Sequence, residues 1–237
     1  MNTVLAASCL LALLAACAAA PARADWHASL RVRRTVAAAP GETGGARERT
    51  VQAWFGADRM REETAGESAY ILRLDLRRSW AVDHGARVSR ELALPPLVDA
   101  PTLRGFDADD GAAVRETGET RTIGAWPCRR WLVTRRVMRG NAAPPARVET
   151  EIWATEAIPA SAFLAERAAF AGASPAGASR RLHDELRKVR GFPVLQIERV
   201  TFLGNTEERV VELLAIEEAV PPPGTYEPPP GYGPGKP

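Results

Sequence analysis

The chain has 237 residues, with 31 lysines and arginines against 29 aspartates and glutamates. This near balance excludes the strong positive field with which many proteins attract nucleic acid, and it offers no bulk attraction for acidic substrates. The length suits one domain with a substantial core. We therefore expect a single folded unit and no nucleic-acid partner.

The first 24 residues have the pattern of a secretory signal peptide. Val4 to Ala20 is an apolar run that is too short and too rich in alanine to hold a membrane-spanning helix firmly. Ala22-Arg23-Ala24 fits the small-x-small site of the ordinary signal peptidase, and we favour cleavage there. The alternative is a lipobox around Cys17, in which that cysteine is lipidated and becomes the first residue.

The two processing sites predict different locations for the protein. Cleavage after Ala24 gives a periplasmic or secreted protein, whereas lipidation of Cys17 gives a membrane-anchored lipoprotein. Membrane contact is expected only in the second case. Cleavage after Ala24 also leaves Cys128 as the one cysteine of the mature chain, so no internal disulfide can form.

From Trp26 onward, short segments of period two alternate with turn residues, which is typical of an antiparallel all-β domain. The clearest strand of the first half is Ala69 to Leu76, in which Tyr70, Leu72 and Leu74 share one face. We predict a mainly β, α+β fold: a curved antiparallel half-barrel of about 10–11 strands spanning residues 25–220. The expected strands of this sheet include 27–36, 47–55, 69–76, 113–123, 126–138, 148–154, 194–203 and 208–217.

Two helices are predicted before the final hairpin, at Ala160 to Phe170 and Ser179 to Val189, where the composition favours helix. The hairpin itself is expected to turn at Gly204-Asn205. Residues 221–237 hold eight prolines and four glycines. We expect this tail to stay outside the sheet, extended along the surface or mobile.

Both faces of the final hairpin carry apolar residues. Val194 and Val200 alternate with Leu195 and Ile197 along the same strand. A strand that is covered on both sides explains this pattern, with a helix on one face and core or ligand on the other.

The strong catalytic and metal-binding motifs are missing from the sequence, so we predict no catalytic residue, no metal and no cofactor. His27, His84 and His183 are isolated, and we interpret them as surface residues. Asp75 and Asp83 flank Trp80 and are expected to cap turns or pair with arginine, since an acid–base pair lacks further support.

Cysteine, tryptophan and arginine each admit a structural and a functional interpretation. Cys128 is expected to be a small buried residue rather than a redox thiol. The six tryptophans are expected to pack mainly in the core, with a ligand-facing wall as the alternative. The arginines at 129, 130, 135 and 136 indicate a solvated strand face, with a site for anionic head groups as the lesser alternative.

Three segments carry a resemblance to known proteins: Ile71-Leu72-Arg73-Leu74-Asp75, Ser79-Trp80-Ala81-Val82-Asp83 and the ending from Pro223 to Tyr232. In these the chain resembles the half-barrel of outer-membrane lipoprotein carriers and sorting proteins, and more specifically an uncharacterised family of exported bacterial proteins related to them. The resemblance implies a curved sheet whose concave face holds acyl chains. On this chain, the residues suited to such a face are Tyr70, Leu72 and Leu74 with Trp80.

The leading hypothesis from the sequence is a non-enzymatic cell-envelope protein that binds a lipid or acyl chain. The main alternative is a module that recognises or senses another envelope protein through a sheet edge or the proline tail. A third is a hydrolase with an unrecognised site. The ligand-binding hypothesis rests on fold resemblance, and a fold can host several functions.

Overall fold

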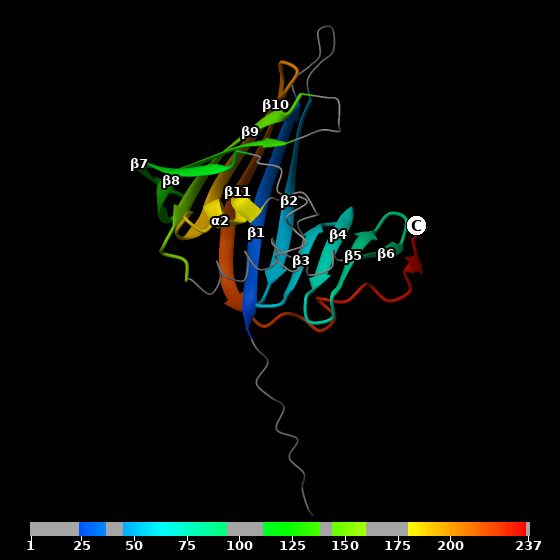
Figure 1. The fold of residues 1–237 in the computed structure, drawn as a ribbon. Coiled ribbons are helices and arrows are strands. Elements are labelled where there is room, and N and C mark those ends of the chain that lie inside the picture. Colours follow the sequence, from blue (N-terminus) through cyan, green and yellow to red (C-terminus); the bar gives the residue numbers. More distant parts are fainter. Residues whose placement is uncertain (1–23, 37–44, 94–110, 138–143, 160–179, 236–237) are drawn as a thin grey trace, which may run out of the picture.

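The computed structural model describes residues 24–36, 45–93, 111–137, 144–159 and 180–235. In this part the chain forms twelve strands and one helix (Figure 1). The elements are β1 (Asp25–Val36), β2 (Gly45–Phe55), β3 (Arg59–Thr64), β4 (Ser68–Arg73), β5 (Arg78–Asp83), β6 (Val88–Ala93), β7 (Ala113–Ile123), β8 (Trp126–Val137), β9 (Ala146–Thr155), α2 (Arg180–Leu186), β10 (Phe192–Phe202), β11 (Asn205–Ala219) and β12 (Gly233–Pro234).

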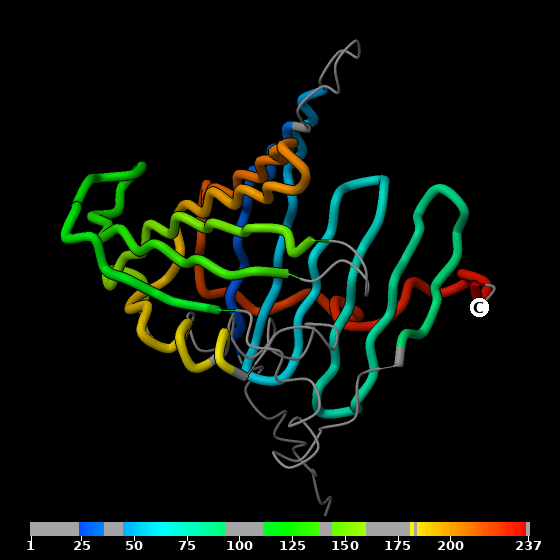
Figure 2. The backbone as a smooth tube through the Cα atoms, turned by 45° about the horizontal axis from the view of Figure 1, so that its top comes forward, coloured from blue at the N-terminus to red at the C-terminus, as the bar shows by residue number. Residues whose placement is uncertain are grey.

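All twelve strands belong to one open, curved sheet, in the order β12-β6-β5-β4-β3-β2-β1-β11-β10-β9-β8-β7. Every pairing is antiparallel except that of β12 with β6. The sheet consists of two runs of consecutive strands, β1 to β6 and β7 to β11, which join where β11 pairs with β1 along the whole length of β1. Figure 2 shows the two runs spreading from this central junction.

The hairpin between β10 and β11 turns through Leu203 and Gly204, which have φ values of 49° and 82°. A two-residue loop with positive φ at both positions matches the right-handed twist of the flanking strands. The predicted turn at Gly204-Asn205 is thus shifted by one residue, since Asn205 already pairs with Phe202 in the ladder. Glycine supplies one of the two left-handed positions without steric cost.

Strand alternation divides the sheet into two faces. Val32, Val211 and Gln196 lie in register on the face against which α2 packs, which we call the helix face. Arg33, Val210 and Ile197 lie in register on the opposite side, which we call the groove face.

The main core lies largely on the helix face and includes Ala53, Phe55, Met60, Leu72 and Leu213. A second cluster forms where α2 and the turn after it meet β8 and β9. There Leu182 and Val189 contact Trp131 and Ile152. These contacts explain why a helix of only seven residues persists, because packing rather than intrinsic propensity stabilises so short a segment.

The prediction of a mainly β, curved sheet is confirmed, but three of its details are not. The described part contains twelve strands rather than 10–11, and the sheet is mixed because β12 is parallel to β6. The helix expected at 179–189 is confined to Arg180–Leu186. The helix expected at 160–170, like the signal region 1–23 with Cys17, lies outside the described residues.

The expectation that the tail stays outside the sheet is wrong. Gly233 and Pro234 form β12, in which the Gly233 N–H donates to the Arg87 carbonyl at 3.0 Å. The glycines provide the backbone donors that the prolines lack. Between β11 and β12 the tail crosses the strands β2 to β5 (Figure 2). It packs on the groove face, where Tyr226 contacts the cluster of Ile71 and Val82.

A buried carboxylate ties the tail to the start of β1. Both the Tyr226 hydroxyl and the Arg59 Nε–H donate to the same Oδ2 atom of Asp25, at 2.7 and 2.9 Å. Asp25 is only 3% exposed, and its other oxygen lies so close to Gly56 that a Cβ at that position would be 2.6 Å away. The first residue of β1 is therefore contacted by two separate segments of the chain, the turn between β2 and β3 and the tail.

Candidate functional site

The four residues that the sequence suggested for a ligand wall do not share one surface. Register places Trp80 opposite Ile71, so Trp80 lies on the groove face, whereas Tyr70 and Leu72 lie on the helix face. Leu72 is fully buried in the main core, with Tyr70 and Leu74 packed against it. Leu74 itself lies in the turn after β4, where its N–H donates to the Asp58 carbonyl at 2.8 Å. Trp80 belongs instead to the cluster beneath the tail.

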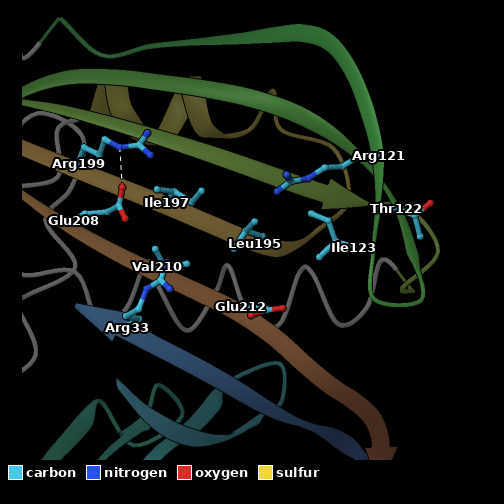
Figure 3. Close-up of a pocket in the computed structure, with 10 residues that line it drawn as sticks. All are labelled: Arg33, Arg121, Thr122, Ile123, Leu195, Ile197, Arg199, Glu208, Val210 and Glu212. Atoms are coloured by element: carbon cyan, nitrogen blue, oxygen red, sulfur yellow. Dashed lines mark hydrogen bonds and ion pairs between the residues drawn. The ribbon is translucent and has the colours of Figure 1, made fainter. Parts of the chain in front are cut away.

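An open groove lies farther along the groove face, over β10, β11 and β1 (Figure 3). Its floor consists of four half-buried aliphatic side chains, Leu195 and Ile197 from β10, Val210 from β11 and Ile123 from the end of β7. The groove has a volume of about 520 Å³. Small-molecule sites in proteins commonly measure about 300–1,000 Å³, so the groove is large enough for a ligand.

Two ion pairs neutralise the carboxylates that line the groove. Arg199 donates to Glu208 at 2.9 Å across the β10–β11 hairpin, and Arg31 donates to Glu212 at 3.2 Å. Two further guanidinium groups face the groove, those of Arg33 and Arg121. Among the described residues, neither of these has a carboxylate within ion-pair distance. The lining therefore retains positive charge that its own acids do not balance.

The groove approaches the protein core beside Trp153. The Arg121 guanidinium lies over the Trp153 ring, 4.0 Å from its centroid, and the ring is 4% exposed. The indole Nε1–H donates to Glu151 at 2.6 Å, and Arg130 donates to the other oxygen of the same carboxylate at 2.7 Å. Burial alone would raise the pKa of Glu151, but these hydrogen bonds outweigh it and keep the pKa below the ordinary value. A charged, fixed carboxylate thus orients the ring on which Arg121 rests.

A second cavity, of about 430 Å³, lies between the sheet and the tail. Trp54 and Arg61 form part of its floor, and Pro222 to Pro230 contribute the opposite wall. His27 stacks on Trp54 with ring centroids 4.4 Å apart. Because the tail itself forms part of the lining, this cavity belongs to the packing of the tail.

The isolated titratable residues mostly have structural partners. Asp75 is hydrogen-bonded to Arg73 at 2.6 and 2.8 Å, and this partner lowers the pKa of Asp75. Asp83 accepts the N–H of Ala86 at 2.8 Å within the next turn. Both outcomes confirm the predicted roles in turns and arginine pairing.

The two histidines whose side chains are described lie at the surface, as predicted, and each also contacts an aromatic ring. His27 is half-buried against Trp54, and His84 is half-buried with its Nδ1 atom 3.0 Å from the Tyr232 hydroxyl. The side chain of His183 lies outside the described set. Among the described residues, no group of three or more His, Cys, Asp or Glu is placed to hold a metal ion.

Cys128 is buried, as predicted. It is 2% exposed, and burial raises the pKa of its thiol. Its Sγ–H donates to the Trp126 carbonyl at 3.3 Å. The helix α2 is far too short to cross a membrane, and no other described segment forms a helix that could.

The tryptophans divide between the predicted roles. Trp131 is buried beneath α2, and Trp54 and Trp80 lie under or beside the tail. Trp153 is the one that borders the groove through Arg121. Of the predicted arginine cluster, Arg130 serves the Glu151 network, and Arg129 pairs with Glu116 at 3.3 Å.

Arg33 and Arg121 were not singled out by sequence reasoning. The signal that pointed towards them was the apolar pattern on both faces of the final hairpin, because Leu195 and Ile197 form the groove floor. The flanking arginines come from β1 and β7. Strand order places β1 beside β11, whereas β9 and β8 separate β7 from β10, so Arg121 comes near the floor through the curvature of the sheet.

No protein-family model and no curated protein matches the sequence. Similar solved structures include PNGF-II, with 9% identity and a TM-score of 0.32. The match covers 84% of this chain and 29% of the PNGF-II chain. A putative outer membrane lipoprotein-sorting protein domain from Vibrio parahaemolyticus has 6% identity and a TM-score of 0.28, covering 82% of this chain and 85% of that one. A DUF1329 family protein from Desulfovibrio piger has 8% identity and a TM-score of 0.31, covering 85% and 88%.

Proposed function

We propose that this chain is a non-enzymatic cell-envelope protein that binds a lipid or acyl chain, and that the groove of Leu195, Ile197, Val210 and Ile123 is its binding site. The observation that carries the proposal is this open floor of half-buried aliphatic side chains on the second face of a sheet whose other face packs the core. The groove replaces the surface that the sequence suggested, because Leu72 is fully buried.

The energy for such binding comes from removing apolar surface from water. At roughly 25 cal/mol per Å², a few hundred square ångströms of acyl contact supplies several kcal/mol, from which the cost of ordering the ligand is subtracted. An open groove of this kind favours moderate affinity and ready exchange. This suits a protein that passes on or presents its ligand.

Recognition of another envelope protein is the second candidate, supported by the outer edge of β7. This strand of eleven residues ends the sheet among the described strands. Part of its edge is already occupied, because the Val114 N–H donates to Glu185 of α2 at 2.9 Å. The proline tail is a weaker candidate, since Tyr226 and β12 fix it to the protein.

Native mass spectrometry of the protein purified from its own host, followed by organic extraction, tests the proposed function. A co-purified lipid, or saturable binding of a fluorescent fatty acid, is the expected result. The Ile197→Asn variant should lose binding because it places an amide in the apolar floor.

Leu214→Asn is the matched control for that variant. Leu214 lies on β11, the strand that pairs with the β10 strand of Ile197, but it is 38% exposed and does not line the groove. The Leu214→Asn variant should bind the fluorescent fatty acid as the unmodified protein does. Failure to bind any lipid or fatty-acid probe would refute the proposal, as would equal binding by the Ile197→Asn variant in its folded form.

A further inference from the structure

We infer that the groove selects single-chain amphiphiles with an anionic head, and that this head binds Arg121 at one side of the apolar floor or Arg33 at the other. The inference rests on the proposed function, because it names the chemical class of the hydrophobic ligand. It is carried by the distribution of charge around the apolar floor.

The charge around the floor is uneven in a way that favours anions. Glu208 and Glu212 already have arginine partners at 2.9 and 3.2 Å. Arg33 and Arg121 have no carboxylate partner among the described residues. An anionic head group would provide the missing partner, whereas a cationic head would face repulsion and a neutral head would gain no ion pair.

Arg121 is the better prepared of the two guanidinium groups. Its stacking on the Trp153 ring restricts the side chain without using the N–H donors, which remain available in the guanidinium plane. The ring is held in turn by its hydrogen bond to Glu151. A donor group that is ordered before binding loses less entropy when the ligand arrives.

The positions of the arginines match a ligand with one chain and one head. Figure 3 shows Arg121 reaching over the floor from β7, while Arg33 comes from β1 on the opposite side. Leu195, Ile197 and Val210 lie between them. An acyl chain on this floor therefore brings its head towards Arg121 at one side or Arg33 at the other.

Isothermal titration with four probes of equal chain length tests the inference: dodecyl phosphate, dodecanoate, dodecyl maltoside and dodecyltrimethylammonium, each below its critical micelle concentration. The two anionic probes should bind about tenfold more tightly than the neutral maltoside, because charge-assisted hydrogen bonds at an exposed site are only modestly favourable. The preference should shrink between 0.05 and 1 M salt as screening increases. Comparing phosphate with carboxylate identifies which anionic head fits better.

In the variant R33Q/R121Q, the ratio of the affinity for anionic probes to the affinity for the maltoside should fall close to one. The affinity for the maltoside itself should be retained. R33K/R121K retains the charge and should restore part of the preference. R147Q is the matched control, since Arg147 is an exposed arginine of β9 that pairs with Glu149 and does not line the groove.

Two results separate this inference from the proposed function. Equal binding of anionic and neutral probes, or an anionic preference that survives R33Q/R121Q, would overturn the role of the arginines and leave the hydrophobic site standing. Binding of no probe at all would overturn the proposed function and the inference with it.

Discussion

The Tyr226 hydroxyl gives the sharpest test of how the tail is held. Tyr226 is 6% exposed and donates at 2.7 Å to an Asp25 carboxylate that is 3% exposed. Tyr226→Phe removes this donor but keeps the ring, so the carboxylate loses one of its two side-chain donors and retains Arg59. A hydrogen bond to a charged group contributes about 1.5–3 kcal/mol. We expect the free energy of unfolding to fall by that amount.

Urea unfolding followed by tryptophan fluorescence measures this change. With a slope of about 2 kcal/mol per molar urea, a loss of about 2 kcal/mol moves the midpoint down by roughly 1 M. Tyr232→Phe is the matched control, because the Tyr232 hydroxyl meets the half-buried ring of His84 rather than a buried carboxylate. A change below about 0.5 kcal/mol for Tyr226→Phe would refute the view that this contact holds the tail.

The same contact predicts a dependence on alkaline pH. Burial, together with the neighbouring Asp25 carboxylate, raises the pKa of the Tyr226 phenol above its ordinary value near 10. The unfolded chain releases this proton as the pH rises past about 10, whereas the folded protein retains it, so stability should decline above that pH. Tyr226→Phe should show a shallower decline. Identical slopes in the two proteins would contradict the assignment.

Three further predictions concern the start of β1, the buried thiol and the processing site. Gly56→Ala places a Cβ 2.6 Å from the Asp25 Oδ1 atom and should lower the free energy of unfolding by about 1–3 kcal/mol, as measured by urea titration. Gly45→Ala is the control, because a Cβ at that position meets no atom within 4 Å. Cys128 should react with iodoacetamide at neutral pH only on unfolding, since burial raises the pKa of its thiol, and rapid labelling of the folded protein would contradict this. Intact mass should show a mature chain that begins at Asp25, whereas a lipid-modified Cys17 would establish the alternative.

Local alternation was sufficient to locate most strands from the sequence. The range predicted for β7, 113–123, agrees with the structure, and β8 was predicted within one residue of its observed end. In the second of these strands Trp131, Val133 and Val137 lie in phase, and turn residues separate both strands from their neighbours. Information of this kind is contained within a dozen residues, so no tertiary contact is needed to recognise it.

The arrangement of faces could not be obtained in the same way. Tyr70 and Leu72 were correctly placed together, but the position of Trp80 depends on its pairing with Ile71 through the turn after β4. Ile71 is as fully buried as Leu72 because the tail contributes Tyr226 to its cluster. Tyr226 and Ile71 are far apart in the sequence, and the bond from Tyr226 to Asp25 joins residues 201 positions apart. No periodicity within a single strand reports it.

The tail determines how much of the groove face is open. After β11 it turns towards β2 and ends beside β6, so it covers the surface of Ile71 and Val82 and leaves the floor of Leu195, Ile197 and Val210 uncovered. Both regions are apolar surfaces on the same side of one sheet, and within the part of the chain that the structure describes only one of them is covered. This asymmetry is the strongest reason to look for an external ligand over β10, β11 and β1. It also requires binding experiments to keep the tail intact, because a truncated chain would expose a second apolar surface that competes for the same probes.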